Sequence, residues 1–161
     1  MTTAEKSGVA SVDRFWRQVE EKRRGEHLYV SLLGLRTFET AELHSLLEDG
    51  LSYQALECLR RVLDLPLSRV SELVRIPPRT LARRRGSGRL HPDESDRLAR
   101  LARLVGLALQ LFEGDLPGTR AWLETPQAAL AGQTPLEFST TEIGSREVEN
   151  LIGRLEHGVP L

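Results

Sequence analysis

The sequence predicts an all-α protein in which a basic pair of short helices is followed by a small helical C-terminal module. Three observations support this fold class. Leucine is frequent while aromatic side chains make up only 5% of the 161 residues, which favours helices over a β-sandwich. From residue 40 onward, apolar residues recur with helical spacing between helix-start and helix-stop signals. No alternating strand pattern persists past residue 35.

The N-terminal part carries the weakest structural signals. Residues 1–12 have the composition of a disordered segment and 12–24 could form a short charged helix, so we expect 1–27 to be flexible or partly helical. The apolar run at 28–35 fits either a buried strand or a helical turn. No hydrophobic leader and no membrane-spanning run is evident, so we expect a cytoplasmic protein with no membrane partner. The single Cys58 excludes an internal disulfide, which fits a reducing compartment.

Five successive helices are expected in the middle of the chain. Thr40 and Ser52 are N-cap candidates for the first two, and each of these helices carries a leucine stripe. The last and longest begins with Pro92, and its second half is apolar on almost all sides, as in a central buried helix. The expected helices span residues 40–50, 52–66, 67–76, 77–88 and 91–114.

Residues 68–85 have the size and order of a helix-turn-helix, whose second helix enters the DNA major groove. At about 100° per residue, the arginines of the second helix share one arc, with Leu81 and Ala82 behind it. Guanidinium groups match phosphate oxygens and the guanine edge, although a solvated basic face is the alternative. The predicted DNA-binding residues are Arg79, Thr80, Arg83, Arg84 and, beyond the Gly-Ser-Gly turn, Arg89.

The charge distribution supports two different partners. Residues 69–103 hold 10 basic and 4 acidic side chains, whereas residues 104–161 hold 3 basic and 8 acidic ones, although the net charge of the chain is only −1. A basic block beside an acidic one favours one polyanionic partner and one partner of another kind.

The C-terminal stretch 134–158 predicts a docking surface. TPLE at 134–137 is a capping box with proline at the first helical position, and Gly158 is suited to end the helix that follows. Val148, Leu151, Ile152 and Leu155 form the apolar stripe of that helix. Gly153 costs the helix about 1 kcal/mol relative to Ala, which is reasonable if another chain packs there; an ordinary exposed face with an incidental glycine is equally compatible. The opposite face carries Glu142, Arg146, Glu149, Asn150, Gly153, Arg154 and His157.

No catalytic or cofactor-binding set is evident in the sequence. The four histidines are scattered, and there is no CxxC or HxxxH spacing and no glycine-rich phosphate loop. Adjacent acids such as Asp93 and Glu94 are better explained by a helix start than by acid–base catalysis. We therefore expect no enzyme, no metal, no cofactor and no small-molecule substrate.

A dense motif joins these features. Its C-terminal part consists of GQTPLE (132–137), TE (141–142), Gly144, REV (146–148), Leu151, GR (153–154) and EHG (156–158). Its upstream part consists of LLGL (32–35), EDGLSYQALECL (48–59) and TLARRRGSGRL (80–90). Over about residues 28–160 the sequence thereby resembles the Xre/MbcA/ParS-type antitoxins, with Pro77 and His91 in place of polar helix caps.

The resemblance implies the antitoxin of a type II toxin–antitoxin system. Such antitoxins cover the active-site entrance of a Res-type toxin, which resembles ADP-ribosyltransferases and depletes NAD, and they repress their own operon through operator DNA, commonly as homodimers. It implies a helix-turn-helix DNA-binding domain at 28–97 and a toxin-binding domain at 98–161. The toxin would be contacted by Glu142, Arg146, Glu149, Asn150, Gly153, Arg154, His157 and Gly158.

Two other functions remain compatible with the residues. One is a stand-alone helix-turn-helix transcriptional regulator whose C-terminal module only dimerises. The other is a helical adaptor without a role at DNA.

Overall fold

The computed structural model describes residues 28–159, so the expectation for residues 1–27 lies outside the described residues. Within the described range the chain forms helices and no strand, which confirms the all-α prediction. The run at 28–35, for which the sequence left strand and helical turn open, contains a short helix. The helices are α2 (Leu28–Leu32), α3 (Thr40–Asp49), α4 (Tyr53–Leu63), α5 (Leu67–Leu73), α6 (Pro78–Ser87), α7 (Pro92–Leu111), α8 (Leu116–Leu123), the 3-10 turn η1 (Ala128–Leu130), α9 (Pro135–Phe138) and α10 (Glu142–Glu156).

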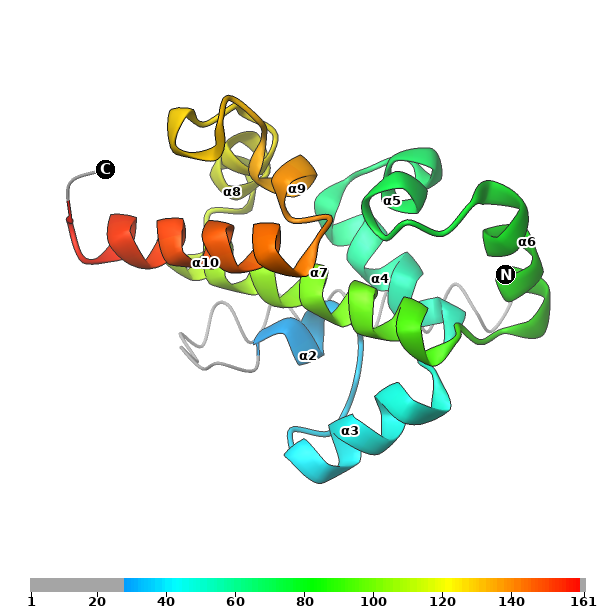
Figure 1. Ribbon diagram of the computed structural model, residues 1–161. Coiled ribbons are helices and arrows are strands. Elements are labelled where there is room, and N and C mark those ends of the chain that lie inside the picture. Colours follow the sequence, from blue (N-terminus) through cyan, green and yellow to red (C-terminus); the bar gives the residue numbers. More distant parts are fainter. Residues whose placement is uncertain (1–27, 160–161) are drawn as a thin grey trace.

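Helix α7 is the centre of the molecule, as its nearly all-round apolar second half predicts. It contacts α2, α3, α8 and α10, and the pair α5 and α6 lies beside its N-terminal half (Figure 1). Leu98, Leu104 and Val105 are fully buried on it. A Cβ at Gly106 would lie 3.4 Å from the backbone nitrogen of Tyr29, an ordinary van der Waals contact, so α2 packs directly on this part of α7. Truncating a leucine here to alanine would cost about 2–5 kcal/mol.

The two halves of the described chain share one core. The buried apolar side chains of α4, α5, α7, α8 and α10 belong to a single cluster. Helix α7 is continuous from Pro92 to Leu111, so it contributes side chains to the helix pair at one end and to the C-terminal module at the other. No helix of residues 28–159 is long and apolar enough to cross a membrane.

Polar contacts also connect the N-terminal half to the C-terminal module. Each comes from an arginine that donates to an oxygen on the other side of the boundary. The bonds are Arg69 to the Glu137 carboxylate (3.1 Å), Arg75 to the Thr140 hydroxyl (3.4 Å) and Arg120 Nε to the Val62 carbonyl (2.9 Å). The first two hold α5 and its following turn against α9, and the third holds α8 against the end of α4.

The corner before α10 is tightly built. The capping box expected at 134–137 is present: the backbone N–H of Glu137 donates to the Thr134 hydroxyl at 3.2 Å, and the Glu137 carboxylate accepts from the Thr134 backbone N–H at 3.3 Å. Helix α10 starts after Thr141, whose hydroxyl accepts from the Gly144 N–H at 3.0 Å. A Cβ on Gly144 would lie only 1.8 Å from the Phe138 carbonyl oxygen, so the corner requires glycine there.

Candidate DNA-binding and protein-binding surfaces

The predicted helix-turn-helix arrangement is present in α5 and α6. Ile76 in the turn is 1% exposed and wedges the two helices together, as its apolar character suggests. Arg75 takes a left-handed backbone with φ of 52°, which turns the chain between them. Pro78 is the first residue of α6, and Gly88 ends the helix with φ of 77°. The second helix thereby lies at the surface with one face outward.

The outward face of α6 carries free arginines. Arg79 and Arg83 are exposed, and neither makes an ion pair or hydrogen bond with another residue of the part of the chain that the structure describes. Thr80 is half-buried beside them. Gly86 continues the same ridge at i+7 from Arg79, and a Cβ on it would meet nothing within 4 Å. An open ridge of unpaired guanidinium groups is available to phosphate or to base edges.

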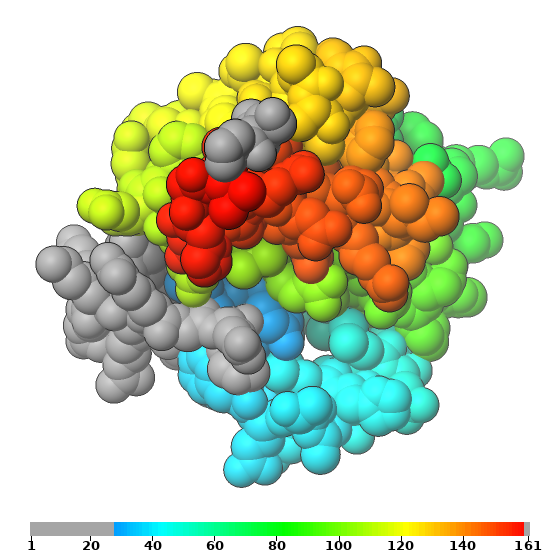
Figure 2. Space-filling view, turned by 60° about the vertical axis from the view of Figure 1, so that its left-hand side comes forward, coloured from blue at the N-terminus to red at the C-terminus, as the bar shows by residue number. Residues whose placement is uncertain are grey.

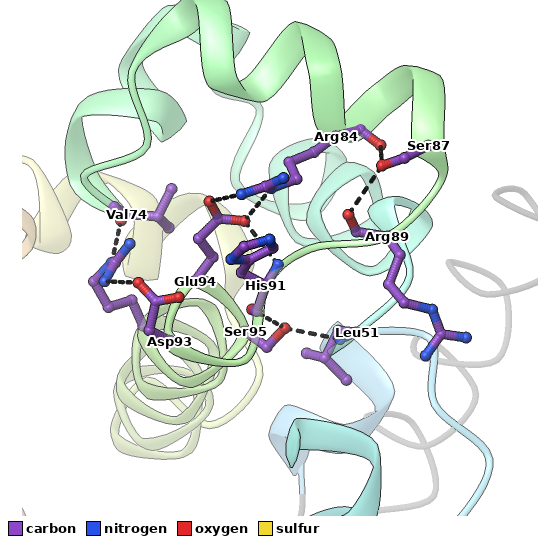
Figure 3. A network of polar contacts seen from close by, with 10 residues as sticks. Leu51, Val74, Arg84, Ser87, Arg89, His91, Asp93, Glu94 and Ser95 are labelled. Carbon is purple, nitrogen blue, oxygen red and sulfur yellow. Dashed lines mark hydrogen bonds and ion pairs between the residues drawn. The ribbon is translucent and has the colours of Figure 1, made fainter. Parts of the chain in front are cut away.

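Arg84 does not belong to this outward face, which corrects the helical-wheel prediction. Its side chain is 11% exposed, and its Nε and Nη2 donate to the two carboxylate oxygens of Glu94 at 2.8 and 3.0 Å (Figure 3). The wheel places Arg84 at the edge of the arginine arc, and there the N-terminus of α7 covers it. Arg84 therefore fixes the position of α6 instead of offering its charge to a partner.

Glu94 is the centre of the network that receives Arg84. It is 5% exposed, and it also accepts the backbone N–H of His91 at 2.8 Å, so it caps the start of α7. Burial alone would raise the pKa of Glu94, but the hydrogen bonds from Arg84 and from His91 lower it on balance. Next to it, Ser95 accepts from the Leu51 N–H at 2.8 Å and joins α7 to the start of α4 (Figure 3). This network replaces the polar cap that the sequence lacks at His91.

Arg89 is exposed, but its guanidinium is engaged. Its Nη1 donates to the carbonyls of Asp49 and Gly50 at 3.3 and 3.1 Å, behind the C-terminal end of α3. The cationic group is thus anchored near the end of α6 while part of it faces solvent. DNA contact by Arg79, Thr80, Arg83 and Arg89 stays a prediction.

Helix α10 buries the stripe that its sequence predicts. Val148, Leu151 and Ile152 are at most 3% exposed and pack on α7. The helix lies across one face of the molecule with its other side uncovered, from orange to red in Figure 2. Arg146 and Asn150 are exposed on that side, and a Cβ on Gly153 would meet nothing within 4 Å. We call Arg146, Asn150, Gly153 and His157 the outer face of α10.

Glu142 and Glu149 lie at the edge of α10 that faces α7, not on its outer face. Glu142 pairs with Arg100 at 3.0 Å and Glu149 pairs with Arg103 at 2.7 Å. Glu149 is only 22% exposed, so the expectation that it is freely presented is wrong. These acids lie at positions i and i+7, where the helical angle brings them within reach of the arginines of α7. They hold α10 in place.

The C-terminal end of α10 completes this surface. His157 is exposed and its Nδ1 donates to the Gly153 carbonyl at 2.7 Å, and Gly158 follows with φ of 64°, as a helix terminator does. Arg154 is half-buried. Two apolar residues were not singled out from the sequence: Ile143 is 78% exposed and Val159 is 49% exposed. The signal for Ile143 is an apolar residue outside the stripe of an amphipathic helix, whereas Val159 lies beyond the end of that helix.

An open groove of about 430 Å³ lies between the turn of the helix pair, α7 and the start of α10. Most of its charged groups are matched: Asp93 pairs with Arg97 at 3.0 Å, and Arg100 bridges Asp96 and Glu142. Arg75, which also lines the groove, makes no ion pair in the described part of the chain and donates to the Thr140 hydroxyl at 3.4 Å. Among residues 28–159, no group of three His, Cys, Asp or Glu side chains is arranged to hold a metal ion.

Comparison with known proteins matches both parts of the chain to family models. A model described as "Antitoxin Xre-like helix-turn-helix domain" matches residues 42–103, and one described as "Antitoxin Xre/MbcA/ParS C-terminal toxin-binding domain" matches residues 107–158. A protein named Antitoxin Xre from Yersinia enterocolitica is 36% identical over 128 residues, which are 79% of this chain and 86% of that protein. A second protein of that name, from Photorhabdus laumondii, is 31% identical over the same shares, and a third, from Pseudomonas putida, is 36% identical over 53% of this chain and 54% of its own.

Proposed function

We propose, because the chain belongs to the Xre family of antitoxins, that it neutralises a Res-type toxin whose ADP-ribosyltransferase-like active site depletes NAD. On this proposal residues 98–161 cover the entrance of that active site, and residues 28–97 bind operator DNA and repress the operon that encodes both proteins. The protein would act in the cytoplasm, as a homodimer on the operator.

The observation that carries the toxin-binding part is the uncovered outer face of α10. The apolar stripe of this helix is already used within the chain, so nothing in the fold requires Asn150 or Gly153 on the other side. A glycine inside a helix costs about 1 kcal/mol relative to alanine, and an open space beside Gly153 allows a partner's backbone to approach closely. To block an active site sterically, the antitoxin needs a surface complementary in shape to the entrance of that site. It needs no catalytic group of its own.

The operator-binding part rests on the free arginines of α6. Arg79 and Arg83 carry charges that no acid of the described chain neutralises, on a helix whose orientation is fixed by Arg84 and Glu94. Dimers of helix-turn-helix proteins place two such helices about 34–36 Å apart, one turn of the double helix. Operator binding should therefore need two copies and should weaken as salt rises.

A reciprocal pair of variants tests both assignments in the full-length protein. Gly153→Trp and Gly86→Trp each place a bulky side chain where a Cβ meets nothing within 4 Å, so both variants should fold. Coexpressed with the toxin encoded next to it, Gly153→Trp should fail to restore growth and cellular NAD but should still bind the operator. Gly86→Trp should neutralise the toxin and lose the operator. If Gly153→Trp neutralises the toxin as well as the parent chain does, the docking assignment is wrong.

A stand-alone transcriptional regulator is the second candidate, and one observation favours it. Ile143 is 78% exposed at the start of α10, and an exposed isoleucine there could pack against the same residue of a second copy. On that alternative, Ile143→Asp would convert a dimer to a monomer and abolish operator binding, while no complex with the neighbouring gene product would form in any variant.

A further inference from the structure

Arg154 differs from three other arginines of α7 and α10 in lacking an acidic partner within residues 28–159. Arg100, Arg103 and Arg146 each pair with a glutamate of α10, at 3.0, 2.7 and 3.5 Å. In the part of the chain that the structure describes, Arg154 makes no ion pair, and its buried Nε has no hydrogen-bond partner.

The helical spacing explains why Arg154 is left without an acid. A side chain on a helix reaches residues three or four positions away, and those of Arg154 are Asn150, Leu151, His157 and Gly158. None of them is acidic, and the glutamates of α10 that face α7 are bonded to Arg100 and Arg103. A buried donor without an acceptor costs free energy, and folded proteins satisfy more than about 90% of such groups.

The surroundings of Arg154 suit a single anionic side chain from another protein. Gly153 beside it leaves open space, and Val159, whose backbone N–H donates to the Arg154 carbonyl at 2.9 Å, is 49% exposed and offers an apolar rim. Residues 104–161 carry 8 acidic side chains against 3 basic ones. This negative surplus repels a polyanion such as nucleic acid, but a single carboxylate can still pair with one guanidinium. The planar fork of arginine matches a carboxylate with two parallel hydrogen bonds.

We propose that Arg154 recognises an aspartate or glutamate of the cognate toxin: its own chain covers the Nε, so the side chain turns outward when α10 docks and the guanidinium pairs with that carboxylate. This proposal rests on the toxin-binding function proposed above. It makes Arg154 a central contact of the interface, whereas the more exposed Arg146 lies at the rim.

Calorimetric titration of the purified toxin with the full-length antitoxin tests the proposal. Arg154→Met keeps the apolar stem and removes the charge, and Arg146→Met is the matched control on the same helix. Truncating one partner of a desolvated charge pair should weaken toxin binding about 30-fold or more, mainly through faster dissociation. Loss of an exposed charge should weaken it less than about fivefold. Arg154→Lys keeps the charge but not the fork and should recover only part of the affinity.

The thermal stability of the free antitoxin supplies a second readout. Because Arg154 has no acceptor within the described chain, Arg154→Met should leave the Tm of the free protein unchanged or raise it. A fall in Tm would mean that Arg154 stabilises its own chain and would overturn the proposal, as would equal affinity of Arg154→Met and the parent for the toxin. Absence of any binding by the parent chain would instead refute the proposed function. Charge reversal in Arg154→Glu should be rescued by toxin variants in which an acidic residue becomes Lys or Arg.

Discussion

Replacing Gly153 with alanine should make the free protein more stable and at the same time a poorer antitoxin. Alanine is favoured over glycine in a helix interior by about 0.8–1.0 kcal/mol. Nothing lies within 4 Å of the added Cβ, so this gain should be realised in full. For a chain of this size, about 1 kcal/mol raises the Tm by about 2–4 °C.

The same substitution at Gly144, in the same helix, is the matched control. There the added Cβ would lie 1.8 Å from the Phe138 carbonyl oxygen and 2.9 Å from the Thr141 hydroxyl, whereas ordinary contacts begin near 3.4 Å. The backbone of the corner must move, and overpacking of this kind costs about 1–3 kcal/mol. This cost exceeds or cancels the gain in helix propensity, so Gly144→Ala should leave the Tm unchanged or lower it.

Differential scanning calorimetry of the two variants and the parent measures these shifts, and titration with the toxin measures the cost in binding. On the outer face of α10 the new methyl group of Gly153→Ala occupies space that a closely packed partner needs. Toxin affinity should therefore fall while the Tm rises. The reasoning is refuted if Gly153→Ala and Gly144→Ala shift the Tm in the same direction by similar amounts. If Gly153→Ala binds the toxin as tightly as the parent, the glycine has no role in close approach.

Three further outcomes are expected. Arg79→Ala and Arg83→Ala should each lower operator affinity without changing the Tm. In gel-shift assays at several salt concentrations, the slope of log K against log salt should become shallower by about 1 for each arginine that binds a phosphate in the parent. Arg84→Met should lower the Tm and operator affinity together, because it leaves the buried Glu94 carboxylate without its cation. The added change Glu94→Leu should recover part of the lost Tm in thermal melts, since it removes the buried charge but also the cap on the His91 N–H. Hydrogen bonds from Thr134 and then Arg69 hold the pKa of Glu137 below its usual value. The stability that Glu137 contributes is present above about pH 4.3, the usual pKa of glutamate, and is lost as pH falls through the lowered pKa. The Tm of Glu137→Gln should therefore fall less steeply than that of the parent as the solution is acidified.

Much of the C-terminal surface could be predicted from the sequence, because the sequence patterns that specify it are local. The capping box at 134–137 and the stripe of α10 depend only on neighbours within one or two turns, and both are present as expected. The sequence could not decide between strand and helix for residues 28–35, because an apolar stretch of that length suits either. In the structure this stretch contains the short helix α2, which packs on α7.

The sequence by itself determined the all-α class, the helices between residues 40 and 114, the basic helix pair and the amphipathic C-terminal helix, since periodicity and capping act within a single element. Only the tertiary structure decided which charges are free. Arg83 and Arg84 are adjacent residues of one type, yet Arg83 faces solvent while Arg84 meets Glu94 across the start of α7. On α10, Glu149 forms an ion pair with Arg103 of α7, whereas Arg154 has no acidic partner in the described chain. A helical wheel gives the direction of a side chain around its own axis, and the neighbouring helix that meets it there is set by how the whole chain packs.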